Sequence, residues 1–252
     1  MKLIHWDCLE EMKKMESESV DMILTSPPYD NLRTYNWSLN WNFEIFQDIA
    51  KECARVIKKW WVIVWVVWDA TIKWSETWTS FRQALYFKDE CWLNLHDTMI
   101  YAKQNYKPTN AKRYDNVFEY MIIFSKWIPN TFNPIMVNKA RVKIEKWKYR
   151  QKDWSFIETN RKANPFKKHI NIFSYSIWWH IADKIAFQHP AIFPKKLAED
   201  HILSWSNEWD IVLDPFAWSW TTWVACKNLN REFIGIELDE TYFNIAKDRI
   251  WN

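Results

Sequence analysis

Along most of the chain, short continuous apolar runs alternate with segments in which apolar residues recur at helical spacing. The runs predict strands within 1–7, 19–29, 62–67, 95–103, 118–126, 210–217 and 232–239. The helical segments are 42–59, 80–90, 193–206, 221–229 and 240–250. Continuous apolar runs are typical of strands that are buried on both faces of a parallel sheet. The alternation therefore predicts an α/β fold with a doubly wound, Rossmann-like parallel sheet.

This alternation breaks down between residues 127 and 188. Within that stretch, 139–168 carry eleven Lys or Arg against three acidic residues, a net charge of +8 in a chain whose total is +3. A solvated face and a phosphate-binding surface can both have this composition. Its confinement to one irregular insert with interleaved aromatic residues favours the second. We therefore expect half of a core at 1–126, a basic insert at 127–188 and the other half of the core at 189–252.

Glycine is almost missing from the sequence. The 252 residues include one glycine, Gly235, and 21 tryptophans, whereas average usage predicts roughly 18 glycines. By position, 18 of the tryptophans, all except Trp41, Trp65 and Trp205, stand where a chain turns or caps a helix. Such positions favour glycine, because they need a positive φ or a close approach of backbone. A chain naturally rich in tryptophan is the alternative, but the pattern favours tryptophan standing in the place of glycine.

Other features of the sequence narrow the class of protein. The four cysteines are scattered, without a CxxC pair or metal-ligand spacing. This predicts reduced thiols, no structural metal and a cytoplasmic location. No run of 18 uncharged apolar residues is present to span a membrane. The N-terminal segment lacks the apolar core of a signal peptide.

The first candidate motif is DPFAWSWTT, which runs from Asp214 to Thr222 between a strand and a helix. With glycine at 218 and 220, this turn of small residues before a helix N-terminus forms a cradle for a nucleotide-like ligand. Glu237 ends the next strand about 20 residues further on, where an acid holds ribose hydroxyls. A phosphate-binding dinucleotide turn is the alternative, and the missing G-x-x-G spacing argues against it.

The second motif is Ser26-Pro27-Pro28-Tyr29, at the end of the second predicted strand. Its plainest interpretation is a turn stiffened by two prolines. The Ser26 hydroxyl and the Pro27 carbonyl, fixed by the proline φ values, can also both accept hydrogen bonds from one exocyclic amine. Tyr29 can then stack on the ring that carries this amine. Ligands gather at this edge of open α/β sheets.

In this order, the two motifs resemble the β class of DNA amino-methyltransferases, which move a methyl group from S-adenosylmethionine to a base nitrogen. The resemblance covers nearly the whole chain, with the catalytic motif first, the insert second and the cofactor turn last, a circularly permuted order. The form LTSPPY resembles the N4-cytosine members, because adenine-specific members more often begin the motif with Asp or Asn. The resemblance therefore implies transfer to N4 of cytosine, with transfer to N6 of adenine as the alternative.

The resemblance also implies roles for individual residues. The catalytic loop is Ser26, Pro27, Pro28 and Tyr29. The implied cofactor-binding residues are Asp7, Phe193, Pro194, Asp214, Phe216, Ala217, Ser219, Thr221, Thr222 and Glu237. Asp7 also has a simpler interpretation, as an acid at the end of a strand.

The sequence departs from the family pattern at Trp6, Trp218, Trp220 and Trp223, where members have small residues. We expect indoles there to fill the cofactor pocket and to leave the chain inactive, so an inactive DNA-binding protein is a further alternative. The resemblance implies double-stranded DNA as the substrate and a restriction endonuclease as a candidate partner; the oligomeric state stays open. A protein or RNA methyltransferase is disfavoured by the size and charge of the insert.

Overall fold

The computed structural model describes residues 1–29, 41–106, 108, 112–139, 144–162, 164–176, 194–218 and 220–251. These residues form two compact units, one made of 1–133 and 171–252 and the other of 134–170. The second unit lies inside the range predicted for the insert. None of the helices within the described ranges has the length and apolarity needed to cross a bilayer.

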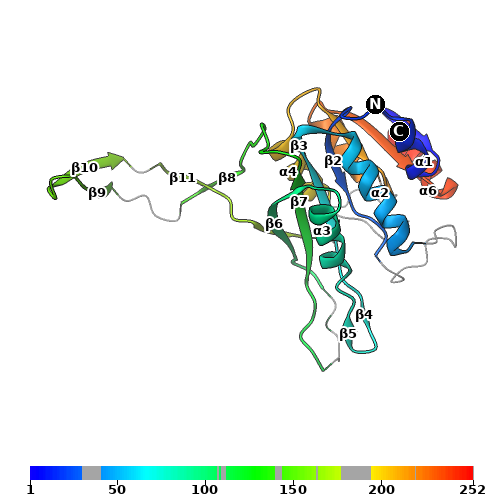
Figure 1. Cartoon of the computed structure of the whole chain (residues 1–252), viewed down its shortest axis with the longest axis horizontal. Coiled ribbons are helices and arrows are strands. Elements are labelled where there is room, and N and C mark those ends of the chain that lie inside the picture. Colours follow the sequence, from blue (N-terminus) through cyan, green and yellow to red (C-terminus); the bar gives the residue numbers. More distant parts are fainter. Residues whose placement is uncertain are drawn as a thin grey trace. The chain divides into compact units, whose positions relative to one another are not determined.

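An eight-stranded sheet forms the centre of the first unit (Figure 1). The strand order is β1 (Lys2–His5), β14 (Glu232–Glu237), β13 (Ile211–Asp214), β2 (Val20–Thr25), β3 (Ile57–Val67), β7 (Phe118–Ser125), β6 (Asn94–Lys103) and β12 (Ile172–Tyr175). The predicted α/β fold is confirmed. The expectation of an entirely parallel sheet is wrong at β7, which runs antiparallel to β3 and β6. The chain returns from β6 to its neighbour β7 as a hairpin, whereas a parallel pair needs a crossover.

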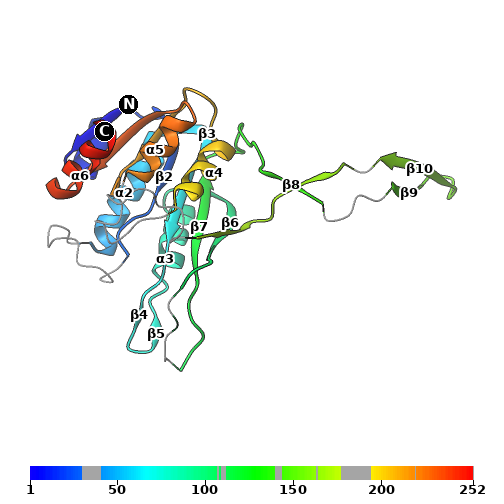
Figure 2. The same ribbon diagram turned by 180° about the vertical axis from the view of Figure 1, so that it is seen from behind.

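Helices cover both faces of this sheet. On one face lie α1 (Cys8–Lys14), α2 (Phe43–Val56) and α3 (Thr79–Asp89), with α2 between the other two (Figure 1). On the other face α4 (Lys195–Trp205) packs against α5 (Thr221–Asn228) (Figure 2), and α6 (Glu240–Trp251) follows β14. The crossovers that leave the neighbouring strands β2 and β13 therefore use opposite faces. This makes the carboxyl ends of β2 and β13 the switch point of the sheet, where ligands bind in such folds.

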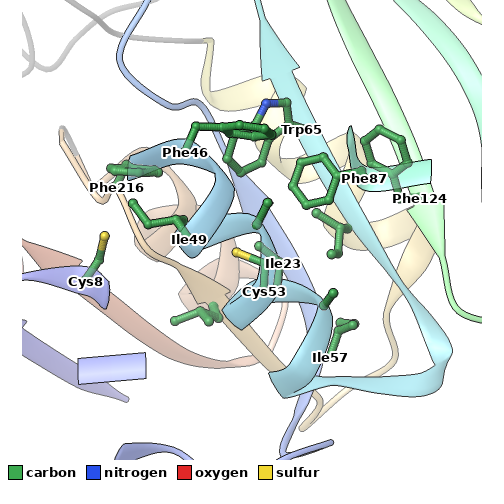
Figure 3. Packing of buried hydrophobic residues seen from close by; sticks show 14 of the residues in the cluster. Cys8, Ile23, Phe46, Ile49, Cys53, Ile57, Trp65, Phe87, Phe124 and Phe216 are labelled. Atoms are coloured by element: carbon green, nitrogen blue, oxygen red, sulfur yellow. The ribbon is translucent and has the colours of Figure 1, made fainter. Parts of the chain in front are cut away.

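An aromatic cluster fills the core between α2, α3 and β3 (Figure 3). The ring of Phe46 lies 5.8 Å from that of Trp65 and 5.5 Å from that of Phe87. Trp65 is completely buried, and its Nε1 donates a hydrogen bond of 2.8 Å to Gln83 Oε1. A buried indole needs such a partner. Trp65 is therefore both packed in the core and satisfied in its hydrogen bonding, as expected for a native tryptophan position.

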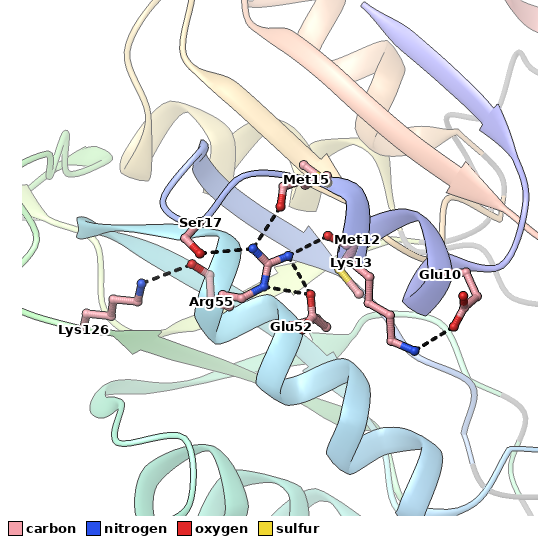
Figure 4. Close-up of polar contacts among 8 residues, drawn as sticks. All are labelled: Glu10, Met12, Lys13, Met15, Ser17, Glu52, Arg55 and Lys126. Atoms are coloured by element: carbon pink, nitrogen blue, oxygen red, sulfur yellow. Dashed lines mark hydrogen bonds and ion pairs between the residues drawn. The ribbon is translucent and has the colours of Figure 1, made fainter.

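A polar clamp joins α1 to α2 (Figure 4). The Arg55 guanidinium donates hydrogen bonds to the carbonyl oxygens of Met12 at 2.7 Å and Met15 at 2.9 Å. It is held in place by Glu52 Oε2, 2.7 Å from Nη2. The last carbonyls of a helix lack their usual i+4 partner. The Met12 carbonyl accepts from the Met15 N–H at 2.9 Å, and Arg55 adds hydrogen bonds to both residues that fix the loop leading into β2.

Two further sequence expectations are corrected. The helix expected over 42–59 ends at Val56, and Ile57 already begins β3. The insert is not irregular in the described residues: β8 (Met136–Asn138) pairs with β11 (Phe166–Lys168), and β9 (Ile144–Arg150) pairs with β10 (Phe156–Lys162), both antiparallel. These strands are rich in charged residues and contain no continuous apolar run. The hairpin of β4 (Thr71–Ile72) and β5 (Ser75–Glu76) had no clear sequence signal.

Tryptophans occupy the left-handed backbone conformations of this fold. Of nine non-glycine residues with positive φ in the described ranges, six are tryptophans: Trp74, Trp78, Trp92, Trp154, Trp209 and Trp220. The first five expose 58–84% of their surface. Each position costs a residue with a Cβ roughly 1–2 kcal/mol. Trp65 and Trp205 have no positive φ and are buried, as the division made from the sequence predicts. The expectation that all 18 of the selected tryptophans stand at turns or caps is wrong at Trp60 and Trp61, which lie inside β3, and at Trp223, which lies inside α5.

Replacing Trp92 by glycine is expected to raise the free energy of unfolding by about 1 kcal/mol, because glycine adopts a positive φ without a penalty. Trp92 has a φ of 57° and is 84% exposed, so little burial is lost with its indole. Urea-induced unfolding followed by circular dichroism measures the change. The matched control is Trp127→Gly, which removes an indole that is 55% exposed from a position without a positive φ. This control should lower stability; equal responses of the two variants would contradict the assignment.

Candidate functional site

Asp214 joins the three elements that meet at the switch point. It is the last residue of β13 and is 2% exposed. Oδ1 accepts hydrogen bonds from Thr25 Oγ1 at 2.6 Å and from the Phe216 N–H at 3.1 Å, while Oδ2 accepts one from Thr222 Oγ1 at 2.7 Å. Burial raises the pKa of Asp214 to about 6, although these hydrogen bonds act in the opposite direction. One carboxylate thus fixes the end of β2, the turn after β13 and the first turn of α5.

The turn between β13 and α5 is anchored to the neighbouring strand β14. The Ala217 N–H donates to the Ile236 carbonyl at 3.0 Å, and the Trp220 N–H donates to the Ala217 carbonyl at 3.1 Å. Trp220 caps α5 in the left-handed conformation with φ 58°, without a capping hydrogen bond from its side chain. A glycine-like backbone is therefore needed here, as the sequence motif predicts.

The loop after β2 is held by a chain of buried hydrogen bonds. Ser26 Oγ donates to Tyr29 Oη at 2.7 Å, and Tyr29 Oη donates to Glu119 Oε2 at 2.9 Å. The other carboxylate oxygen of Glu119 forms an ion pair with Lys103 Nζ at 2.8 Å. Tyr29 is 6% exposed and Glu119 is 7% exposed. The loop is consequently fixed to β7 and β6 as well as to β2.

A cavity of about 130 Å³ lies beside this loop, at the carboxyl ends of β1, β13 and β14. Its described lining residues are Trp6, Asp7, Cys8, Trp41, Ile45, Ile49, Pro215, Phe216, Trp218, Ile236, Glu237, Leu238 and Asp239. The lining is mostly apolar with three carboxylates: Asp7 after β1, Glu237 at the end of β14, and Asp239 two residues later. Such a surface suits a ligand with an apolar ring and a few hydroxyl groups.

Two of these carboxylates, Asp7 and Glu237, have different environments. Asp7 Oδ1 accepts a hydrogen bond from the Glu10 N–H at 3.0 Å and so caps α1. Glu237 is 3% exposed, and its Oε1 accepts a hydrogen bond of 2.8 Å from the Asp239 N–H. Burial raises the pKa of Glu237 to about 8, and the charges of Asp239 and Asp214 add to this.

Two indoles occupy space beside the turn. Trp218 is 7% exposed, lines the cavity, and donates a hydrogen bond of 2.9 Å from Nε1 to the Ser26 carbonyl oxygen. Trp220 is 1% exposed, and its ring lies against Phe233 and Gly235. Its Nε1 is buried without a hydrogen-bond partner in the described residues, which is costly. Pockets for small molecules usually measure about 300–1,000 Å³, so the lining residues suit a nucleotide-like ligand but the remaining volume does not.

The sequence-predicted site residues fall into four groups. Asp7, Phe216 and Glu237 line the cavity, and the Ser26–Tyr29 loop lies next to it through Trp218. Asp214, Ala217, Thr221 and Thr222 are buried in the turn and at the start of α5. Pro194 is the N-cap of α4 and is not among the described lining residues. Phe193 and Ser219 lie outside the described residues.

Sequence reasoning assigned no role to Glu119 and did not find its partner Lys103. The segment Phe118-Glu119-Tyr120 resembles a strand that backs the target-base pocket in the family, but the pattern gives no contact for the carboxylate. The only usable signal is an acid inside an otherwise apolar strand, since a buried carboxylate needs a partner.

Comparison with known proteins gives the class of protein. Residues 20–248 match the DNA methylase family, and the chain belongs to this family. The orphan methyltransferase M.BamHII of Bacillus amyloliquefaciens is 48% identical over 247 residues, which cover 93% of this chain and 89% of that protein. The DNA adenine methyltransferase YhdJ of Escherichia coli (strain K12) is 28% identical over 260 residues, which cover 98% and 82%. The expected kind of enzyme is thereby confirmed at the level of the family.

Solved structures agree with the fold. The PvuII DNA methyltransferase, described as cytosine-N4-specific, superimposes with a TM-score of 0.72 at 20% identity, covering 99% of this chain and 86% of that one. The M1.HpyAVI–SAM complex gives a TM-score of 0.60 at 25% identity, with 98% of each chain covered. The Rossmann-like sheet predicted from the sequence is therefore that of known DNA methyltransferases.

The raised pKa of Glu237 predicts that stability falls as the pH rises from 6.5 to 8. The folded state keeps the proton up to about pH 8, whereas the reference carboxyl loses it near pH 4.5. Between these two pH values the folded state binds more protons than the unfolded state. The contribution of Glu237 to the free energy of unfolding is therefore complete below pH 4.5 and lost above pH 8. The loss between pH 6.5 and 8 is on the order of 2 kcal/mol.

Urea-induced unfolding at several pH values measures this fall, and Glu237→Gln should abolish most of it. The window avoids Asp214, whose pKa is about 6, and His201, whose pKa burial lowers to about 4. The exposed Glu240 provides the control, since Glu240→Gln should keep the wild-type slope. A wild-type slope in Glu237→Gln would show that another group is responsible.

Proposed function

We propose that this protein scaffold transfers a methyl group from S-adenosylmethionine to N4 of cytosine in double-stranded DNA. One observation carries the proposal: the Ser26–Tyr29 loop and the Asp214–Thr222 turn meet at the switch point, where the Thr25 hydroxyl donates a hydrogen bond to Asp214. An amine-binding loop beside a nucleotide cradle is the arrangement that methyl transfer to a base requires.

Each residue of the loop has a separate task in this reaction. The amine of cytosine is a poor nucleophile, because its lone pair is delocalised into the ring. The base must leave the duplex, which costs a few kcal/mol, and stacking on Tyr29 offsets part of this cost. Hydrogen bonds from the amine to Ser26 Oγ and to the Pro27 carbonyl favour a tetrahedral nitrogen and so strengthen in the transition state. S-adenosylmethionine supplies the electrophilic methyl group.

The choice of cytosine rests on Ser26. An uncharged hydroxyl stands where adenine-specific members of the family more often have Asp or Asn. Transfer to N6 of adenine is the second candidate, and the 28% identity to a DNA adenine methyltransferase favours it. The basic residues of 139–168 form the surface for DNA phosphates in either case, and we place the enzyme in the cytoplasm, with a restriction endonuclease as its candidate partner.

The residues of the cavity suit S-adenosylmethionine in chemistry but not in volume. We assign the ribose hydroxyls to Glu237 and the adenine to Asp7, since both residues line the cavity. Trp218 lines the same cavity and its indole reaches the Ser26 carbonyl. We therefore propose that the active form carries glycine in place of the 18 tryptophans that the sequence pattern selects. The chain as printed is then a DNA-binding protein with little or no methyl transfer.

Replacing Trp218 by glycine should increase the affinity for S-adenosylmethionine by about tenfold or more, because overpacking costs typically 1–3 kcal/mol. Isothermal titration calorimetry with the cofactor measures the effect. Trp209→Gly is the matched control: it also replaces a tryptophan by glycine, here at a position with a φ of 71°, but Trp209 is not among the described lining residues. Equal affinities in the two variants would contradict the assignment of Trp218 as the obstruction.

Methyl transfer itself can be measured with labelled S-adenosylmethionine and mixed-sequence duplex DNA, followed by digestion to nucleosides. The form with glycine at all 18 positions should yield N4-methylcytosine, and the chain as printed should yield none. Ser26→Ala and Tyr29→Ala in the glycine form should each lower turnover by roughly a hundredfold, as expected for groups that act in the transition state. N6-methyladenine as the product would select the second candidate. Wild-type turnover in both variants would refute the catalytic loop.

A further inference from the structure

We propose that Glu119 is a positioning residue that makes Ser26 an acceptor for the target amine, with Lys103 as the ion-pair partner of Glu119. The inference rests on the proposed function, because it concerns how the same loop receives an amine. It adds two residues, from strands β6 and β7, to a site that the sequence placed at the ends of β1, β2, β13 and β14.

The order of donors along the buried chain carries this inference. A tyrosine hydroxyl has one proton and can accept hydrogen bonds through its lone pairs. The Tyr29 proton is directed to Glu119 Oε2 at 2.9 Å, so Tyr29 Oη accepts from Ser26 Oγ at 2.7 Å. The single proton of Ser26 is thereby committed to Tyr29. The lone pairs of Ser26 Oγ are left for a ligand that donates, which is what an exocyclic amine does.

A charged carboxylate is needed for this order, because a carboxylate can only accept hydrogen bonds. With a protonated or amide group at 119, the chain could reverse, and Ser26 would then present its proton to the amine. Lys103 Nζ lies 2.8 Å from Glu119 Oε1 and 4.4 Å from the centre of the Trp68 ring. The charge of the buried Glu119 is thus compensated on the side away from Tyr29.

The sheet register explains why these two residues meet. Glu119 on β7 stands opposite Tyr101 on β6, and Lys103, two residues further along, lies on the same face of the sheet. Lys103 and Glu119 are therefore diagonal neighbours across the strand pair. Burial, and then the negative charge of Glu119, raises the pKa of Tyr101, which agrees with a carboxylate enclosed at this point.

The first test uses the full chain as printed and needs no methyl transfer. Tyr29→Phe, Glu119→Gln and the double variant form a thermodynamic cycle, read out by urea-induced unfolding. We expect the double variant to lose less stability than the sum of the two single variants. Glu119→Gln combined with Lys58→Met is the control cycle and should be additive, since Lys58 pairs with Asp21 elsewhere in the sheet, at 2.7 Å. Additive effects of Tyr29 and Glu119 would overturn the proposal.

The second test separates positioning from stability and uses the glycine form. Glu119→Gln and Lys103→Met should lower kcat by roughly tenfold or more, the fold-change expected when one hydrogen bond to a charged group is lost. KM for S-adenosylmethionine should change by less than about twofold, because the cofactor cradle is untouched. Lys58→Met is the control for this test. It leaves the buried carboxylate of Asp21 without its cation and should keep the kcat of the parent protein.

The outcomes distinguish the two proposals. A fall in kcat for Lys58→Met equal to that for Lys103→Met would mean that Glu119 acts only through stability, and would overturn the inference. Absence of methyl transfer in every form, including the glycine form, would instead remove the proposed function. The thermodynamic cycle would still decide whether Tyr29 and Glu119 are coupled.

Discussion

The carboxylate of Asp214 is the contact on which the arrangement of the site depends. It is buried at the end of β13, and it receives hydrogen bonds from β2, from the turn that follows it and from α5. Burial alone would favour the neutral acid, and the raised pKa of about 6 shows that this cost is not fully offset. The interaction nevertheless aligns two motifs that are far apart in the sequence. Burial of Asp214 thus lowers stability, but its hydrogen bonds fix the distance between the amine-binding loop and the cofactor turn.

Much of this arrangement could be predicted from the sequence, because carboxyl ends of parallel strands share one edge. Ser26, Asp214 and Glu237 each end or follow a continuous apolar run, so the edge on which they lie was readable. The sequence did not show that Asp214 faces inward to Thr25 and Thr222 while Asp7 and Glu237 face the cavity. Side-chain direction at a strand end depends on local twist and turn geometry, which apolar runs do not record.

Other features depend on pairings that no local pattern carries. Lys103 and Glu119 meet through the register of β6 and β7. The sequence predicted the strand β7 but not its antiparallel direction. The start of β3 at Ile57 was missed because helical spacing continues through this residue, while the Ile57 C-cap of α2 already has an extended backbone. The strands of the basic unit 134–170 could not be predicted from apolar runs, because charged residues interrupt every such run in this unit.

The left-handed tryptophans have a consequence for the gene. The codon UGA is read as tryptophan in some genetic codes and as glycine in another. If the turn positions are written with this codon, one nucleotide sequence specifies two proteins: one with an open cofactor cradle and one whose cradle contains Trp218 and Trp220. The backbone of Trp74, Trp92 and Trp209 has the φ values that glycine adopts freely. The identity of the residue at these turns would then be a property of the host's transfer RNAs, and an expression host with a different code would produce a methyltransferase fold without its cofactor.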